Sequence, residues 1–126
     1  MASHFVQFSS QAANPQLPGV VDIEPQDLLA HKTEVEIVDV RRPDEFTGEL
    51  GHVPGAQMIV LDTLPQHLGE LSKDRTLVFV CRSGARSARA AAFAKDNGFT
   101  SVFNLKGGML LWNQLGLETD GKQEIY

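Results

Sequence analysis

Cys81, the single cysteine in a chain of 126 residues, is the side chain best suited to nucleophilic chemistry. It follows residues 77–80, an apolar run without polar alternation that predicts a strand buried on both faces. The alanine-rich segment from residue 86 onward predicts a helix directly after it. Sites in open α/β sheets lie beyond the carboxyl ends of the strands, so the sequence predicts that Cys81 is a reactive thiol rather than buried apolar filler.

The loop that follows Cys81 is predicted to bind an anion. Its successive N–H groups can curl into a nest, because Gly84 is free to take a left-handed conformation, and the start of the helix adds a partial positive charge. Residues 76–95 contain no acidic residue, whereas residues 81–89 contain three arginines, and this balance favours the thiolate form of the cysteine. The predicted substrate-binding residues of the loop are Arg82, Ser83, Gly84, Ala85 and Arg86.

Further charged candidates follow a second predicted strand. Asp39, Arg41 and Arg42 come at its carboxyl end, which a parallel sheet places at the same edge as the cysteine loop. Arg41 is therefore a further substrate-binding candidate, with the alternative that Asp39 and an arginine form a structural ion pair. Glu45 is interpreted as part of the first turn of a short helix, where a carboxylate suits the helix N-terminus. His52 lies in a Gly-His-Val-Pro-Gly turn and is interpreted as structural.

Short β-rich runs and helical segments alternate from residue 20 onward. Strands are expected over residues 20–23, 35–40, 57–60, 77–80 and 101–104, the first of them a weaker strand at the sheet edge. Helices are expected over residues 25–31, 43–47, 64–71, 86–97 and 109–115, with proline at the start of the first two. This alternation predicts an α/β fold with a mainly parallel sheet covered by helices on both faces.

The length and the hydrophobic content of 42% favour one domain with a short extension at each end. Residues 1–19 are polar and contain Asn14-Pro15 and Pro18-Gly19, so this N-terminal arm is expected to pack loosely or to dock as a short edge element. The domain itself is placed at residues 20–117, and residues 118–126 are interpreted as a C-terminal tail.

The charge balance and the apolar runs exclude several classes of partner. The net charge of −5, from 16 acidic and 11 basic residues, argues against nucleic acid. The apolar runs reach five residues, too short for a membrane span, and the N-terminus has no secretory pattern, so a cytoplasmic location is expected. One cysteine and four scattered histidines give no metal-ligand spacing, and neither a metal nor a cofactor is expected.

Four motifs in order resemble the signatures of a single-domain rhodanese. They are VDVRRPDEF at residues 38–46, GHVPGA at 51–56, VCRSGARS at 80–87, and NLKGGM at 104–109 with Trp112. The resemblance implies a rhodanese-like α/β fold in which a five-stranded, mainly parallel sheet is flanked by helices on both faces. Gly107 and Gly108 resemble the family's turn, at which glycine lets the backbone approach the active-site loop.

The resemblance also implies a sulfurtransferase reaction. The Cys81 thiolate would take a sulfane sulfur from a small anionic donor such as thiosulfate, and the loop amides from Arg82 to Arg86 would hold the persulfide. Cyanide or a cellular thiol would then remove the sulfur. Because the chain has no second cysteine, the sulfur has to leave to an external acceptor, and a sulfur-relay protein is a further partner to consider.

Two other interpretations stay open. One is a sulfur-relay or regulatory binding module with little turnover of small molecules. The other is a cysteine-dependent phosphatase or arsenate reductase, since these enzymes resemble the family in having a cysteine loop that ends in arginine. Their loops hold five residues between cysteine and arginine, whereas four separate Cys81 from Arg86 here, and the shorter loop favours sulfur over phosphorus chemistry.

Overall fold

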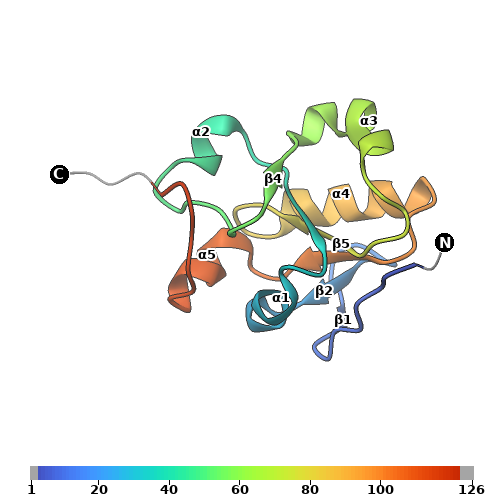
Figure 1. Ribbon diagram of the computed structural model, residues 1–126, viewed down its shortest axis with the longest axis horizontal. Coiled ribbons are helices and arrows are strands. Elements are labelled where there is room, and N and C mark those ends of the chain that lie inside the picture. The colour runs from blue at the N-terminus through green and yellow to red at the C-terminus, as the bar shows by residue number, and fades with distance from the viewer. Residues whose placement is uncertain (1–2, 123–126) are drawn as a thin grey trace.

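A six-stranded sheet forms the centre of the computed structural model, which describes residues 3–122 (Figure 1). The strand order is β1-β2-β6-β5-β3-β4, and every neighbouring pair is parallel except β1 with β2. The strands are β1 (Ala12–Ala13), β2 (Val21–Ile23), β3 (Glu36–Asp39), β4 (Gln57–Met58), β5 (Leu77–Val80) and β6 (Val102–Leu105). All four residues of β5 are buried, so the strand that leads to Cys81 is central, as predicted.

Helices cover both faces of the sheet, which confirms the predicted α/β architecture. They are α1 (Pro25–His31), α2 (Pro43–Phe46), η1 (Leu61–Thr63), α3 (Leu64–His67), η2 (Leu68–Glu70), α4 (Ala85–Asp96) and α5 (Gly108–Gln114), of which η1 and η2 are 3₁₀ helices. Leu77 and Phe79 of β5 pack in the core cluster under α3 and α4, and Val78 and Val80 in the cluster under α1 and α5. This alternation follows from the two-residue repeat of a strand.

The expected number of five strands is wrong by one, because the N-terminal arm supplies β1. This strand pairs antiparallel with β2, so β2, expected at the sheet edge, lies between β1 and β6. Phe8 of the same arm is 5% exposed and packs edge-to-face on Phe103, with 5.1 Å between ring centroids. The described part of the arm therefore docks as an edge element and also contributes a side chain to the core.

The predicted elements agree with the structure within about three residues at each end, with one exception. The helix expected over residues 64–71 is α3 followed by the 3₁₀ helix η2, because the short segment contains Gly69, a residue that disfavours a helix interior. The predicted helix over residues 86–97 is α4, which begins one residue earlier at Ala85. The ends of helices and the extent of short strands depend on individual hydrogen bonds, which the helix and strand propensities of the residues do not determine.

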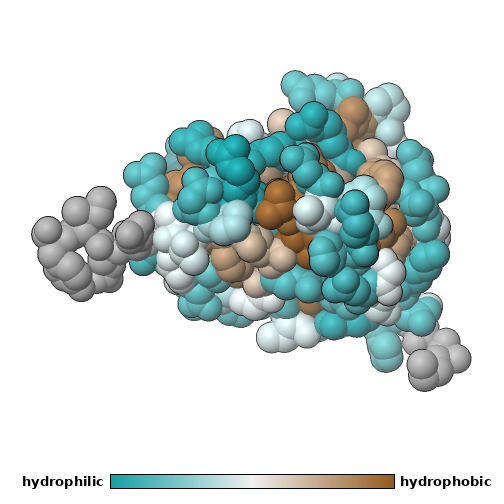
Figure 2. Space-filling view, turned by 90° about the horizontal axis from the view of Figure 1, so that it is seen from above, coloured by the Kyte–Doolittle hydropathy of each residue, from teal (hydrophilic) through white to brown (hydrophobic). Residues whose placement is uncertain are grey.

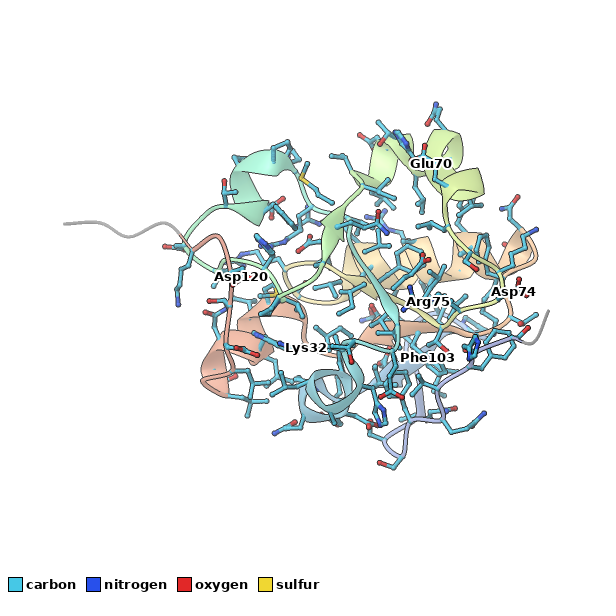
Figure 3. All side chains as sticks on the ribbon, in the orientation of Figure 1. Lys32, Glu70, Asp74, Arg75, Phe103 and Asp120 are labelled. Atoms are coloured by element: carbon cyan, nitrogen blue, oxygen red, sulfur yellow. The ribbon has the colours of Figure 1, made fainter. Side chains whose placement is uncertain are left out.

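The carboxyl ends of the parallel strands meet at one end of the molecule, where α2 and α5 also lie (Figure 1). In Figure 3, Asp120 lies toward this end and Asp74 toward the opposite end, before β5. The backbone of Asp120 pairs with that of His52, so the described part of the tail docks on the domain. Residues 1–2 of the expected arm and 123–126 of the expected tail lie outside the described residues.

The surface of the molecule is mainly hydrophilic. On the face drawn in Figure 2, hydrophilic side chains surround small areas of hydrophobic ones. The large hydrophobic side chains exposed among residues 3–122 are Phe5, Leu110 and Leu115. Within that range, no helix combines the length and the hydrophobicity that crossing a membrane requires.

Candidate active site

Cys81 lies between the end of β5 and the start of α4, as predicted, and its side chain points into the protein. The residue is 1% exposed. Its Sγ accepts a hydrogen bond from the N–H of Gly84 at 3.1 Å and lies 3.3 Å from the Ser87 hydroxyl oxygen. Gly84 has a φ of +104° and is the N-cap of α4, so the loop requires the conformational freedom of glycine here. The first N–H groups of α4 lack intrahelical acceptors and are free to bind an anion.

The N-terminus of α5 fixes the backbone of the cysteine loop from the other side. The N–H of Met109 donates to the carbonyl oxygen of Cys81 at 2.9 Å, and the N–H of Leu110 donates to that of Arg82 at 3.0 Å. A Cβ atom on Gly108 would lie 2.4 Å from the same Cys81 oxygen. Glycine therefore allows the two backbones to approach this closely, in agreement with the expected role of the Gly107-Gly108 turn.

Arg86 forms a bidentate ion pair with Glu45, a residue expected in the first turn of a short helix. Nη1 and Nη2 of Arg86 lie 2.8 and 2.9 Å from Oε1 and Oε2 of Glu45. The hydrogen bonds from Arg86 lower the pKa of Glu45 from 4.5 to about 2, and those to Glu45 raise the pKa of Arg86. Glu45 also accepts a hydrogen bond from the N–H of Arg42, so it begins α2 as well. The sequence did contain a signal for this pair. Glu45 follows β3, whose carboxyl end lies at the same end of the sheet as the arginine-rich loop after β5.

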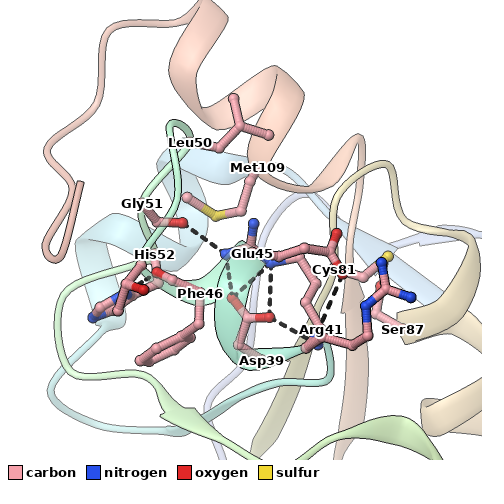
Figure 4. Close-up of polar contacts among 12 residues, drawn as sticks. Asp39, Arg41, Glu45, Phe46, Leu50, Gly51, His52, Cys81, Ser87 and Met109 are labelled. Carbon is pink, nitrogen blue, oxygen red and sulfur yellow. Dashed lines mark hydrogen bonds and ion pairs between the residues drawn. The ribbon is translucent and has the colours of Figure 1, made fainter. Parts of the chain in front are cut away.

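Arg41 forms a buried ion pair with Asp39 (Figure 4). Its Nε and Nη2 each lie 2.9 Å from a carboxylate oxygen of Asp39, and Nη2 also donates to the carbonyl oxygen of Gly51 at 2.6 Å. The two side chains are 1% and 0% exposed. These contacts match the structural alternative for Arg41, and substrate binding by its guanidinium stays a prediction.

His52 packs as a structural residue. Its ring stacks on Phe46 with 3.6 Å between centroids and an angle of 4° between the planes. Nδ1 lies 2.8 Å from the carbonyl oxygen of Phe46. The ring therefore holds the loop after α2, consistent with its interpretation as part of a turn.

The residues of the cysteine loop line two different pockets. The exposed Arg82 lines a pocket of about 190 Å³ together with Arg41, Asp44, Glu45 and Glu49. Ser83, Gly84 and Ala85 line a second pocket of about 350 Å³, whose other lining residues include Asn14, Asp22, Asn104 and Lys106. The loop therefore presents Arg82 to one pocket and its small residues to the other. Across residues 3–122, no three side chains of the metal-ligating types His, Cys, Asp and Glu gather closely enough to hold an ion.

Comparison with known proteins places this chain in a family. The model of the rhodanese-like domain matches residues 24–115. A sulfurtransferase of Allochromatium vinosum is 39% identical over 89 residues, which cover 71% of this chain and 81% of that protein. The thiosulfate sulfurtransferase GlpE of Shewanella oneidensis is 36% identical over 86 residues, 68% of this chain and 83% of that protein. The crystal structure of a rhodanese-related protein from Thermoplasma volcanium matches with a TM-score of 0.71 and 26% identity, covering 77% of this chain and 94% of that one.

The fold and the cysteine loop thus define a small α/β domain of the sulfurtransferase class. The chain belongs to the rhodanese-like domain family, as its four sequence motifs indicated.

Proposed function

We propose that this protein is a rhodanese-type sulfurtransferase that carries a sulfane sulfur on Cys81. The observation that carries the proposal is the position of Sγ, 3.1 Å from the N–H of Gly84 at the first turn of α4. A helix N-terminus stabilises a negative charge, here that of a thiolate or a persulfide. The relative from Shewanella oneidensis is named a thiosulfate sulfurtransferase, and thiosulfate is the donor that we propose for this chain.

The reaction has two steps. The Cys81 thiolate attacks the outer sulfur of thiosulfate, the S–S bond of the donor breaks, and sulfite leaves with the electron pair of that bond. Cyanide or a cellular thiol then attacks the outer sulfur of the persulfide, and the Cys81 thiolate leaves. The loop amides from Arg82 to Arg86 stabilise the charged sulfur, since N–H groups aimed at a developing charge stabilise a transition state. No cofactor takes part in this scheme.

The substrate anion has to share Arg86 with Glu45. Both Nη atoms of the guanidinium already donate to the carboxylate, and a bidentate pair of this kind is strong and directional. We propose that Arg86 orients the substrate from the side of the loop and that Arg82 attracts it at the exposed rim.

Mass spectrometry of the intact protein tests the proposal. After incubation with thiosulfate, the protein should gain the mass of one sulfur atom, and subsequent cyanide should remove it as thiocyanate. Cys81→Ser is the control and should show neither the mass gain nor thiocyanate, with an unchanged circular dichroism spectrum. A protein that gains no mass and yields no thiocyanate does not use thiosulfate, and Cys81-dependent hydrolysis of an aryl phosphate would support a phosphatase instead.

A sulfur-relay module is the second candidate, and the charge of the smaller pocket favours it. Three carboxylates, those of Asp44, Glu45 and Glu49, line this pocket beside two arginines. The carboxylates in this pocket repel a dianion such as thiosulfate, whereas a persulfide on a partner protein avoids that repulsion. Under this alternative, Cys81 gains sulfur from a protein persulfide and not from thiosulfate.

A further inference from the structure

A buried chain of polar side chains connects Cys81 with β2 and the N-terminal arm. The Ser87 hydroxyl lies next to Sγ of Cys81 and is hydrogen-bonded to Oδ1 of Asn104. Nδ2 of Asn104 donates to Oδ1 of Asp22 at 2.9 Å. Ser87, Asn104 and Asp22 are 0%, 2% and 7% exposed. Polar groups buried to this degree are costly unless every donor finds an acceptor, so the direction of each hydrogen bond matters.

Because a carboxylate only accepts hydrogen bonds, Asp22 fixes the direction of the chain at its far end, and the contacts of the arm agree with that direction. Oδ1 of Asn14 accepts the N–H groups of Gln16 and Leu17, each at 2.9 Å, so the amino group of Asn14 must face Asp22. That group donates to Oδ1 of Asp22 at 3.0 Å. Oδ1 of Asp22 therefore accepts from both sides, and Asn104 can approach it only with its own amino group.

The same direction continues to the cysteine. Because the amino group of Asn104 faces Asp22, its carbonyl oxygen faces Ser87 and takes the single proton of that hydroxyl. The oxygen of Ser87 then offers a lone pair to Cys81. In this arrangement Ser87 accepts a hydrogen bond from the thiol S–H, and it cannot donate to a thiolate without leaving Asn104 unpaired.

We propose that Asp22 is a positioning residue that directs this chain and thereby holds Ser87 as an acceptor for the Cys81 thiol. The hydrogen-bonded chain stabilises the thiol, whereas the N–H of Gly84 stabilises the thiolate. The balance between these two effects sets how readily Cys81 ionises. On ionisation the S–H bond breaks and its proton goes to water. The single proton of the Ser87 hydroxyl can then be donated either to Sγ or to Oδ1 of Asn104, but not to both. The inference rests on the proposed function in that Cys81 is the reactive thiol.

Other charged groups lie on the cysteine loop and on the elements near it, and they remain the same in the variants below. They are Arg86 on α4, Arg82 on the loop, Asp39 and Arg41 at the end of β3, Glu45 on α2 and Lys106 after β6. The helix α5 packs on the loop and contains no charged residue. A change in the ionisation of Cys81 on substitution of Asp22 therefore comes either from the altered hydrogen bonds between Asp22 and Ser87 or from the lost charge of Asp22 itself.

Two substitutions of Asp22 separate these causes. Asp22→Asn removes the charge and keeps an oxygen that accepts from Asn14 and Asn104. Asp22→Ala also removes the acceptor, so the Asn104 amide is free to turn toward water in the 350 Å³ pocket that both residues line. Its amino group then donates to Ser87, whose proton turns to Sγ. Ultraviolet absorbance of the thiolate, measured against Cys81→Ser, gives the midpoint pH of ionisation, because the chain has one cysteine.

The midpoint for Asp22→Ala should lie roughly half to one pH unit below that for Asp22→Asn, the shift expected from one hydrogen bond gained by the thiolate. In a Ser87→Ala background the two variants should have the same midpoint. Asn14→Ala, which leaves Asp22 as an acceptor for Asn104, should retain the wild-type midpoint. Equal midpoints for the two Asp22 variants, or a difference that persists without Ser87, would overturn the proposal.

Asn104→Ala provides a second route if Asp22→Ala does not fold, as judged by thermal unfolding. This variant removes the acceptor of the Ser87 hydroxyl and should therefore also lower the midpoint pH. An unchanged or higher midpoint would contradict the proposed role of the hydrogen-bonded chain. The absorbance measurement requires no sulfur donor. A failure of sulfur transfer, which would sink the proposed function, is therefore distinguishable from a failure of this inference.

Discussion

The Glu45 carboxylate determines where the cation beside the cysteine loop is held. Nη1 and Nη2 of Arg86 each donate to one carboxylate oxygen of Glu45, and the pair joins α2 to α4 across 41 positions of the sequence. The sequence indicates the arginine but not its partner, because a carboxylate in a first helical turn already has an adequate local explanation. The pair positions the guanidinium, and an incoming anion competes with Glu45 for it.

The pH dependence of stability should reveal this pair. Folding lowers the pKa of Glu45 from 4.5 to about 2, so the pair stabilises the protein fully above pH 4.5, and this contribution is lost as the pH falls toward 2. Glu45→Gln should therefore reduce the free energy of unfolding by about 1 kcal/mol at pH 7 and by less at pH values near 3. Urea unfolding at the two pH values measures the difference. A deficit of the same size at both would show that the carboxylate charge is not the cause.

Removal of Arg86 should impair sulfur transfer partly by leaving Glu45 without a partner. Arg86→Ala is expected to lower the rate with thiosulfate about tenfold, since one lost transition-state contact of about 1.4 kcal/mol has this effect. The unpaired carboxylate then repels the anion, so Arg86→Ala combined with Glu45→Ala should recover part of the loss. Steady-state thiocyanate formation by the wild type, Arg86→Ala, Glu45→Ala and the double variant measures the coupling. Additive effects of the two substitutions would mean that Glu45 does not act through Arg86.

At the scale of elements, periodicity and proline positions predicted the central sheet and its helices. The buried run of β5 and the alanine-rich α4 have distinctive compositions, and they position Cys81. β1 has no distinctive composition: it consists of two exposed alanines that pair with β2 through the backbone. The sequence therefore did not predict it. The hydrogen-bonded chain from Ser87 to Asp22 could not be predicted from the sequence either. It depends on the register of β2 and β6, which places Asp22 opposite Asn104.

The contact between α5 and the cysteine loop should make Gly108 intolerant of a side chain. Its φ is +56°, and an added Cβ would meet the carbonyl oxygens of Cys81 and Arg82 at 2.4 and 2.5 Å. Gly116, just beyond the same helix, has a φ of +72° with no atom within 4 Å of the added Cβ. Gly108→Ala should therefore cost about 3 kcal/mol, from backbone strain plus overlap, and Gly116→Ala about 1 kcal/mol, from strain alone.

Chemical denaturation and thiocyanate assays of both glycine variants give the comparison. Gly108→Ala should also reduce sulfur transfer where it is still folded, because the displaced loop misplaces the N–H of Gly84, whereas Gly116→Ala should retain it. If the two variants lose the same stability and activity, α5 does not position the loop.

At the scale of the whole molecule, the folded unit extends beyond the segment that the family model matches. That segment begins at residue 24, yet the arm before it supplies β1, the core side chain of Phe8 and the Asn14 contact to Asp22. The N–H of Val6 also donates to the hydroxyl of Thr76, next to β5. The polar composition of residues 1–19 predicts an arm outside the domain, but a single well-placed aromatic ring is enough to anchor such a segment.

Replacement of that ring tests whether the arm belongs to the cooperative core. Phe8→Ala should lower the free energy of unfolding by about 3 kcal/mol, the cost of removing a buried aromatic side chain, although residue 8 lies outside the matched segment. Phe5→Ala is the matched control, because Phe5 is 42% exposed and its loss should cost less than about 0.5 kcal/mol. Urea unfolding followed by circular dichroism measures both. Equal, small effects would mean that the arm folds independently of the sheet, whereas the expected contrast, with one unfolding transition, makes the arm a structural part of the domain that carries Cys81.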